Sequence, residues 1–404
     1  MAGRPIRFRP PRVEVPPEVR WMLLRAFGPA GADFPGVIDP AAALAVSRRF
    51  EVAARIAART GRASLSAELG AEGAGAFLRE QAAAAALGLR FLALAGEVAA
   101  LADPLGLPVI FLKFAALEAC HLTLPGARGA CDLDLLVPEP GAEALQNALK
   151  DRGWRPSGMP ASEHQLPPIE HPDGGIVELH RRILGVRPGG RRSATADSLA
   201  RRDLLVPLAN LPGRCAAPVR EVLAAHALAH GVGQHGWWPA SYSPLKMIGD
   251  LIDTGFAADH DLAARAVALV TRDVSAAEAG ALRALCADLV AGSDPLGPGM
   301  DHGSGAALFL RHILAGRTDS EYAAALHLGL FSAQPSDRPP AVRLARTLLH
   351  AVFLTRAQVD AIYGPPQGPL GYWGRRLARP FDLVWRLVRY SARLLRLQRN
   401  PRRR

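Results

Sequence analysis

The sequence predicts an α+β protein in which a small mixed β-sheet core is embedded between mainly α-helical segments. Residues 19–103 and 219–354 are rich in alanine and leucine, with apolar residues at helical spacing. Between them, residues 109–112, 133–137 and 176–180 are short apolar runs with β-branched residues, which is typical of buried strands. Hydrophobic residues make up 49% of the chain and charged residues 21%, so the composition is globular.

Helical patterns and turn residues define the remaining segments of the chain. We expect helices over Phe50–Ala58 and Phe77–Ala102, and Pro104 ends the second one. Residues 186–214 are rich in Arg, Gly, Pro and Ser and predict a loop. The predicted organisation has four parts: an N-terminal helical region (1–104), an α/β core (105–185), a C-terminal helical region (186–363), and a linker with a basic amphipathic tail (364–404).

Cysteine usage and the N-terminus indicate a cytoplasmic protein. The four cysteines form no C-x-x-C pair, which favours reduced thiols over a disulfide framework or a zinc site. The basic, proline-rich N-terminus lacks the apolar run of a signal peptide. No uncharged apolar stretch of 18 residues is present, so we expect no transmembrane helix.

The positive charge is concentrated at the C-terminus. Residues 375–404 contain eleven arginines and one aspartate, whereas the whole chain has a net charge of +11. The remaining body is therefore nearly neutral, which disfavours a long nucleic acid as partner. Arginines at 3-4-3 spacing (386, 389, 393 and 396) alternate with apolar residues. This pattern predicts a basic helix that lies on an anionic membrane surface or binds an acidic partner; the alternative is a helix packed on the body.

Two aspartates, Asp132 and Asp134, are separated by one residue in an apolar run that predicts a strand. Side chains alternate along a strand, so both carboxylates point to the same face. Two ionised carboxylates on one face repel each other unless a cation lies between them, and Mg²⁺ is the cation that oxygen ligands favour. The alternative is a surface strand with solvated carboxylates, but the neighbouring apolar residues argue for burial.

Three further charged residues complete the predicted site. Glu178 lies in the middle of the strand over residues 176–180, on the same face as His180. If that strand lies beside the aspartate strand, three carboxylates converge, with Lys113 and Arg128 available to neutralise phosphates. The alternatives are structural: Glu178 would pair with Arg181 or Arg182, Lys113 would extend to solvent at a strand end, Arg128 would pair with Asp132, and His180 would be a core or supporting histidine.

These residues, in this order, resemble the bacterial family of uncharacterised nucleotidyltransferases within the polymerase-β-like superfamily. The resemblance rests on Val109 to Lys113, Arg128, Asp132 to Val137 and Val177 to His180, and covers about residues 105–185, with a looser similarity over 45–260. It implies transfer of a nucleoside monophosphate from an NTP such as ATP to an unidentified acceptor. Asp132, Asp134 and Glu178 would be catalytic and bind two Mg²⁺ ions, and Lys113 and Arg128 would bind the nucleotide.

One residue departs from the family pattern. The family has a glycine directly after the lysine, and here that position is Phe114. A phenylalanine could obstruct the approach of a phosphate to the backbone. This leaves two alternatives to the enzyme: a catalytically degenerate nucleotide- or partner-binding relative, and a membrane-surface adaptor that acts through the arginine-rich tail.

Two residue pairs in the later helical region have the spacing of one helix face. His226 and His230 are four residues apart, but no H-E-x-x-H pattern accompanies them, so packing or lining of an acceptor pocket is favoured over zinc. Lys246 and Asp250 have the same spacing and predict an ion pair on a helix surface, with an active-site role as the alternative.

Overall fold

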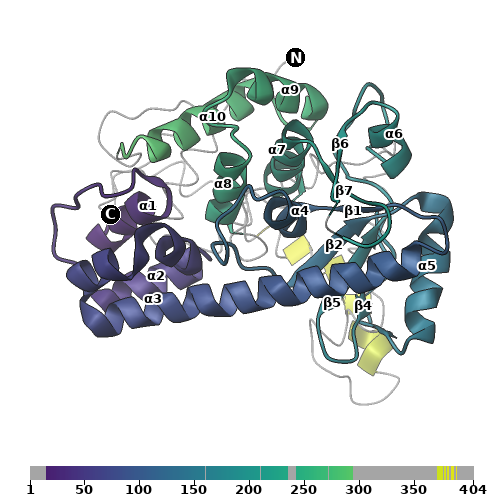
Figure 1. The fold of residues 1–404 in the computed structure, drawn as a ribbon, viewed down its shortest axis with the longest axis horizontal. Helices are drawn as coiled ribbons and strands as arrows, with labels where there is room; N and C mark the ends of the chain where they lie inside the picture. The colour runs from purple at the N-terminus through teal and green to yellow at the C-terminus, as the bar shows by residue number, and fades with distance from the viewer. Residues whose placement is uncertain are drawn as a thin grey trace. The chain divides into compact units, whose positions relative to one another are not determined.

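The computed structural model describes residues 15–293, except residues 160, 210, 235–242 and 272, and parts of residues 371–388. The chain divides into two compact units, residues 13–317 and residues 1–12 together with 318–404. The first unit contains the elements drawn in Figure 1: α1 (Pro17–Phe27), α2 (Pro40–Arg49), α3 (Ala53–Ala102), β1 (Val109–Phe111), α4 (Lys113–Ala119), β2 (Asp132–Leu136), α5 (Glu139–Asp151), β3 (Arg155–Pro156), β4 (Ile169–Glu170), β5 (Ile176–His180), α6 (Ala196–Ala200), β6 (Leu205–Pro207), β7 (Cys215–Pro218), α7 (Arg220–Leu228), the π-helix η1 (Ala229–Gln234), α8 (Pro244–Asp253), α9 (His260–Val270) and α10 (Ala276–Val290).

A seven-stranded mixed sheet lies at the centre of this unit, which confirms the α+β prediction. The strand order is β3-β4-β5-β2-β1-β7-β6. The central strand β2 pairs in parallel with β5 and antiparallel with β1, and β1 pairs in parallel with β7. The three strands predicted from apolar runs are therefore adjacent to one another.

The prediction of a loop over residues 186–214 is wrong in part. This segment contains the short helix α6 and the strand β6, and β7 follows it directly. β6 carries Pro207 and is only three residues long, at the edge of the sheet, which is where proline is tolerated. Short edge strands of this kind leave almost no periodic signal in the sequence.

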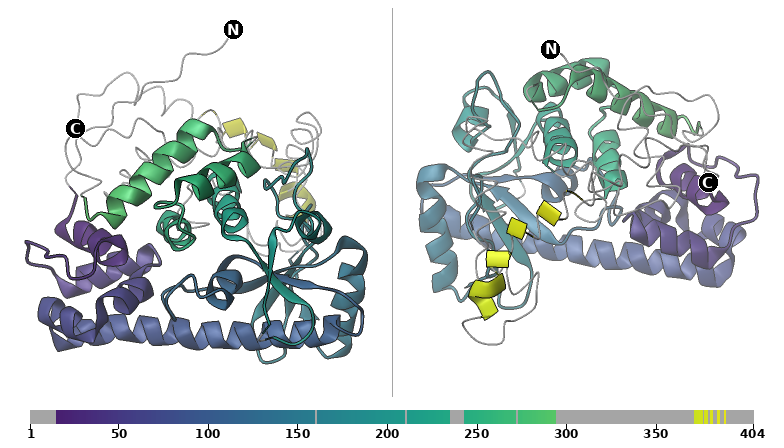
Figure 2. Two further views of the ribbon diagram at one scale, coloured as in Figure 1. Left: turned by 45° about the horizontal axis from the view of Figure 1, so that its top comes forward. Right: turned by 180° about the vertical axis from the view of Figure 1, so that it is seen from behind.

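The end of the long helix α3 packs on the sheet: the helix crosses in front of the strands in Figure 1 and lies below them in the left view of Figure 2. Gly61 and Gly70 have φ angles of 76° and 73° and interrupt it, between the two helices that the sequence predicts. The helix is long and apolar enough to cross a membrane by length and composition. Its residues Phe91, Leu94 and Val98 belong to the hydrophobic core, however, and a core helix passes the same test.

The two faces of the central strands differ in chemistry. Leu133 and Leu135 of β2, with Val177 and Leu179 of β5, are fully buried in the core that α3 and α5 cover. Because side chains alternate, the intervening residues of both strands point to the opposite face. That face carries the polar side chains of the predicted site.

Buried and partly buried ion pairs hold α8 against other parts of the unit. Arg55 of α3 donates to both carboxylate oxygens of Asp253, at 2.8 and 2.7 Å. Lys246 Nζ lies 2.7 Å from Glu51 Oε2. Lys246 and Asp250 therefore take different partners, and the predicted ion pair between them on the helix surface is wrong.

Candidate active site

The register of β2 and β5 brings the predicted carboxylates together. The two strands are parallel, with Asp132 opposite Ile176, Asp134 opposite Glu178 and Leu136 opposite His180. Opposed residues of paired strands point to the same face, so Asp132, Asp134, Glu178 and His180 share one face of the sheet. Glu178 is thus beside the aspartate strand, as the proposed convergence requires.

Asp134 is the centre of the resulting polar cluster. Its side chain is 3% exposed, and its Oδ1 lies 2.8 Å from Lys113 Nζ and 2.8 Å from His180 Nε2. The same His180 Nε2 lies 3.4 Å from Glu178 Oε2. A buried carboxylate needs compensating charge, and a lysine from α4 and a histidine from β5 supply it here.

The site shifts the pKa values of its members in opposite directions. Burial raises the pKa of Asp134, but Lys113 and the hydrogen bond from His180 outweigh burial and hold it well below its usual value. Burial also raises the pKa of Asp132, and repulsion from Asp134 adds to the rise. For Lys113, burial lowers the pKa, but the attraction of Asp134 and then Asp132 exceeds this effect and the pKa is raised. The two aspartates of one strand therefore have different proton affinities.

His180 lies closer to the centre of the site than the sequence indicated. Burial lowers its pKa, but hydrogen bonds to Asp134 and Glu178 outweigh burial and raise it. The sequence feature that could have indicated this role is the position of His180 two residues after Glu178, on the same strand face. His164 was missed altogether, and its ring centroid lies 5.3 Å from that of His180. An isolated β-bridge between Gln165 and His180 places the segment that contains His164 next to β5. No sequence pattern indicates this bridge.

Three side chains of the site could ligate a metal ion. Among the residues that the structure describes, Asp134, Glu178 and His180 each offer one ligand atom within 4.8 Å of the others. Asp132 lies on the same face and is half-buried. Carboxylate oxygens suit Mg²⁺, and a histidine nitrogen also suits Mn²⁺ or Zn²⁺, so the donor set fits a divalent cation.

Lys113 reaches the site from an unusual backbone conformation. It is the first residue of α4 and has a φ of 44°, which lies in the left-handed region. A non-glycine residue in this region is strained, and such strain is found most often at functional sites. The conformation aims the first residue of α4 at Asp134.

Phe114, which stands where the resembling family has glycine, lies in the core. It is 3% exposed, and its ring packs edge-on against Phe91 of α3 with centroids 6.5 Å apart. Its backbone has no positive φ, unlike that of Lys113. The ring therefore fills space on the α3 side, and the position does not require the conformational freedom of glycine.

Arg128 is held by Asp250 of α8. Its Nε and Nη2 donate to the two carboxylate oxygens of Asp250, at 2.6 and 2.9 Å, and both side chains are buried. The structural partner is therefore Asp250 and not Asp132. Binding of a phosphate by Arg128, as predicted, would have to compete with this bidentate pair.

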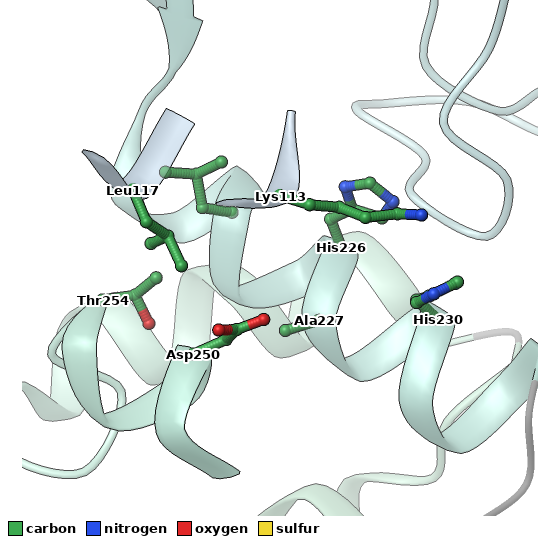
Figure 3. A pocket seen from close by; sticks show the side chains of 8 residues that line it. Lys113, Leu117, His226, Ala227, His230, Asp250 and Thr254 are labelled. Atoms are coloured by element: carbon green, nitrogen blue, oxygen red, sulfur yellow. The ribbon is translucent and has the colours of Figure 1, made fainter. Parts of the chain in front are cut away.

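A small cavity of about 20 Å³ adjoins Lys113, enough for about one water-sized sphere. Figure 3 shows Lys113 lying alongside His226, with Asp250 and Thr254 across the cavity. Burial, then the positive charge of Lys113, lowers the pKa of His226 to about 3. The rings of His226 and His230 are 6.0 Å apart and edge-on, and in the described residues they form no three-ligand cluster. Both histidines line the cavity next to the site.

Comparison with known proteins agrees with this geometry. Residues 37–252, more than half of the chain, match the model of a family described as uncharacterised nucleotidyltransferase. The match spans the sheet strands β1 to β7, α7 and most of α8, and contains all five predicted site residues. No curated protein and no solved structure matches.

The ion pair of Arg128 can be tested by removing its partner's charge. We expect Asp250→Asn to lower the free energy of unfolding by about 3–5 kcal/mol, because it leaves a buried guanidinium without its carboxylate. Chemical denaturation followed by circular dichroism measures the change. Asp151→Asn, at an exposed position of α5, is the control and should stay within about 0.5 kcal/mol of the parent. Equal losses in the two variants would contradict the assignment.

The buried neutral state of His226 predicts a pH dependence of stability. Its pKa is about 3 in the folded chain, against 6.5 for an unperturbed histidine. The unfolded chain therefore takes up a proton that the folded chain does not, and stability declines as the pH falls below about 6.5. In His226→Gln the slope of unfolding free energy against pH, measured from pH 6 to 4, should decrease by up to about 1.4 kcal/mol per pH unit. His121→Gln, at an exposed position, is the control; a parent-like slope in His226→Gln would refute the prediction.

Proposed function

The chain belongs to the family of uncharacterised nucleotidyltransferases, and from this premise we propose that it transfers a nucleoside monophosphate from an NTP to an acceptor. The observation that carries the proposal is the register that opposes Asp134 to Glu178, with Asp132 on the same face. Asp134 and Glu178 each offer an oxygen within 4.8 Å of the other, and Asp132 lies on the same face of the sheet. Acidic residues so close together are costly unless a cation or a cationic side chain compensates them.

Asp132, Asp134 and Glu178 would hold Mg²⁺, with two ions expected, and His180 would support them. When bound, the ions would polarise the phosphates and clamp the attacking and leaving oxygens. His180 orients the carboxylates of Asp134 and Glu178 by bonding to both. The chain's own contribution is otherwise positioning and charge stabilisation, because nucleotidyl transfer requires no covalent intermediate on the protein.

Lys113 is the cation best placed to contact the triphosphate. It is held at Asp134, and its raised pKa keeps the ammonium charged at neutral pH. A phosphate entering next to Asp134 would offer this ammonium a second partner. Arg128 would act mainly through Asp250, by fixing the segment that leads into β2 against α8. ATP is the proposed donor, and the acceptor is a small molecule, a peptide, a protein or an RNA.

Incubation of the protein with each labelled NTP, Mg²⁺ and cell extract tests the activity. We expect labelling of an acceptor, and a loss of rate of at least about 100-fold in Asp132→Asn, Asp134→Asn and Glu178→Gln, because each removes one of the converging charges. Asp151→Asn and Glu143→Gln, at exposed positions of α5, are the matched controls. Transfer that survives all three substitutions would overturn the proposal. Binding of nucleotide without transfer would identify a non-catalytic relative.

We further propose that the C-terminal segment attaches a cytoplasmic protein peripherally to an anionic membrane. The described residues of 371–388 are helical, and six large apolar side chains there are exposed: Trp373 (56%), Leu377 (70%), Phe381 (78%), Val384 (60%), Trp385 (65%) and Val388 (55%). At 100° per residue they fall within an arc of about 120°, which is one face of a helix.

Charge complements this apolar face. Residues 375–404 carry eleven arginines and one aspartate. Tryptophan and phenylalanine on one side and arginines along the rest are typical of helices that lie in the interface of anionic bilayers. The basic residues would attract the lipid headgroups, and the apolar face would enter the boundary of the acyl chains.

Vesicle sedimentation tests the attachment. The full chain should bind vesicles of phosphatidylcholine with phosphatidylglycerol, and much more weakly vesicles of phosphatidylcholine alone, because arginines require anionic lipid. The triple variant Trp373→Ala, Phe381→Ala, Trp385→Ala should lose at least about tenfold in binding. The control replaces Val37, Leu89 and Leu124, three exposed apolar residues elsewhere, by alanine. Equal binding of the two triple variants, or binding only to an acidic polymer, would refute the membrane proposal.

A further inference from the structure

A second polar hollow lies in the segment between β5 and β6, which the proposed reaction does not use. The segment is tied together by a bridge between Ile183 and Ala194 and by a capping box at the start of α6. In that box Thr195 Oγ1 accepts from Ser198 N, and Ser198 Oγ accepts from Thr195 N. The segment therefore has a defined conformation in spite of its loop-like composition.

Arginines from both ends of this segment surround the hollow, which has a volume of about 530 Å³. Arg191 and Arg192 come from before α6, and Arg201 and Arg202 come from directly after it. The other lining residues are small or hydroxylic: Pro188, Gly190, Ser193, Thr195 and Ser198. No acidic residue is among them, so in the described part of the chain the hollow is lined by one sign of charge.

Arg192, Arg201 and Arg202 bring three like charges to one hollow, and an arginine cannot relieve their repulsion by losing its proton. Within the described residues no ion pair joins a carboxylate to Arg192, Arg201 or Arg202. A bound anion with several charges would remove the repulsion. The planar guanidinium donates two parallel hydrogen bonds to phosphate oxygens, and a ligand with several phosphate groups carries enough negative charge to compensate several arginines.

Buried contacts of Arg187 fix the chain next to this hollow. Arg187, next to the lining residues, is buried and forms an ion pair with Asp273. Its backbone N–H donates to the carbonyl of Leu269 at 2.8 Å. Gly189 has a φ of 72°, and the guanidinium of Arg202 lies where a Cβ on this glycine would stand. The backbone conformation at this position therefore favours glycine.

We propose that this arginine-lined hollow binds a small ligand with two or more phosphate groups, at a site separate from the three carboxylates. Its volume is in the range of small-molecule pockets. The nearly neutral net charge of the body of the chain disfavours a long polyanion as the ligand. Inorganic pyrophosphate and the diphosphate group of an organic ligand share this chemistry.

Calorimetric titration of the full chain with pyrophosphate, in EDTA and without divalent metal, tests the site independently of nucleotidyl transfer. We expect saturable binding that the triple variant Arg192→Gln, Arg201→Gln, Arg202→Gln weakens by at least about tenfold. The control Arg62→Gln, Arg152→Gln, Arg155→Gln removes the same charge from exposed positions elsewhere and should change affinity less than about twofold.

A parallel titration with ADP distinguishes the sources of the ligand. Tighter binding of ADP than of pyrophosphate, lost in the same variant, identifies an organic diphosphate, and equal binding identifies the phosphate groups alone. Binding that Asp134→Asn alters and the arginine substitutions do not would move the ligand to the carboxylate site and overturn the proposal. Equal weakening in the two triple variants, or no saturation at millimolar pyrophosphate, would also overturn it.

Discussion

The buried carboxylate of Asp134 is the constraint on which the site depends. At 3% exposure it has lost nearly all contact with water, and Lys113 Nζ and His180 Nε2, both 2.8 Å away, compensate its charge. These partners come from α4 and from β5, so one charge ties a helix and two strands together. Removing Asp134 would leave Lys113 without its carboxylate, and removing Lys113 or His180 would leave the buried Asp134 with one partner in place of two. Lys113, which has a left-handed backbone conformation, lies next to the face that the carboxylates share.

Ion pairs at longer range complete the site by fixing the helices above the sheet. Asp250 and Asp253 of α8 bind Arg128 and Arg55, which are 122 and 198 residues away in the sequence. Through Arg128 the segment leading into β2 is attached to α8, and the cavity beside Lys113 is enclosed by residues of α4, α7 and α8. Arg128 and Asp250, whose charges could have faced a substrate, therefore stabilise the packing of α8 on the rest of the unit. Breaking a buried pair of this kind is costly, because it leaves an uncompensated charge in the interior.

Much of the sheet and of the site could be predicted because their signals are local. The alternation in residues 132–137 and 176–180 predicted both strands and the face that Asp132, Asp134 and Glu178 share. Phe114 illustrates the limit of such reasoning. Its position after Lys113 predicted an obstruction, but the ring packs against Phe91, because the direction of a side chain at a helix start follows from packing on another helix. His164, β6 and the partner of Arg128 likewise left no local signal.

The sequence by itself determined which side chains lie on which face, because a strand has a period of two and its pattern of apolar residues must point to the core. It also determined that the basic charge is concentrated in residues 375–404. Only the tertiary structure decided that β5 lies parallel to β2 with Glu178 opposite Asp134, that Lys113 compensates Asp134, and that Asp250 holds Arg128. These pairings join residues far apart in the chain, and they depend on the mutual packing of strands and helices, for which no short stretch of sequence carries the information.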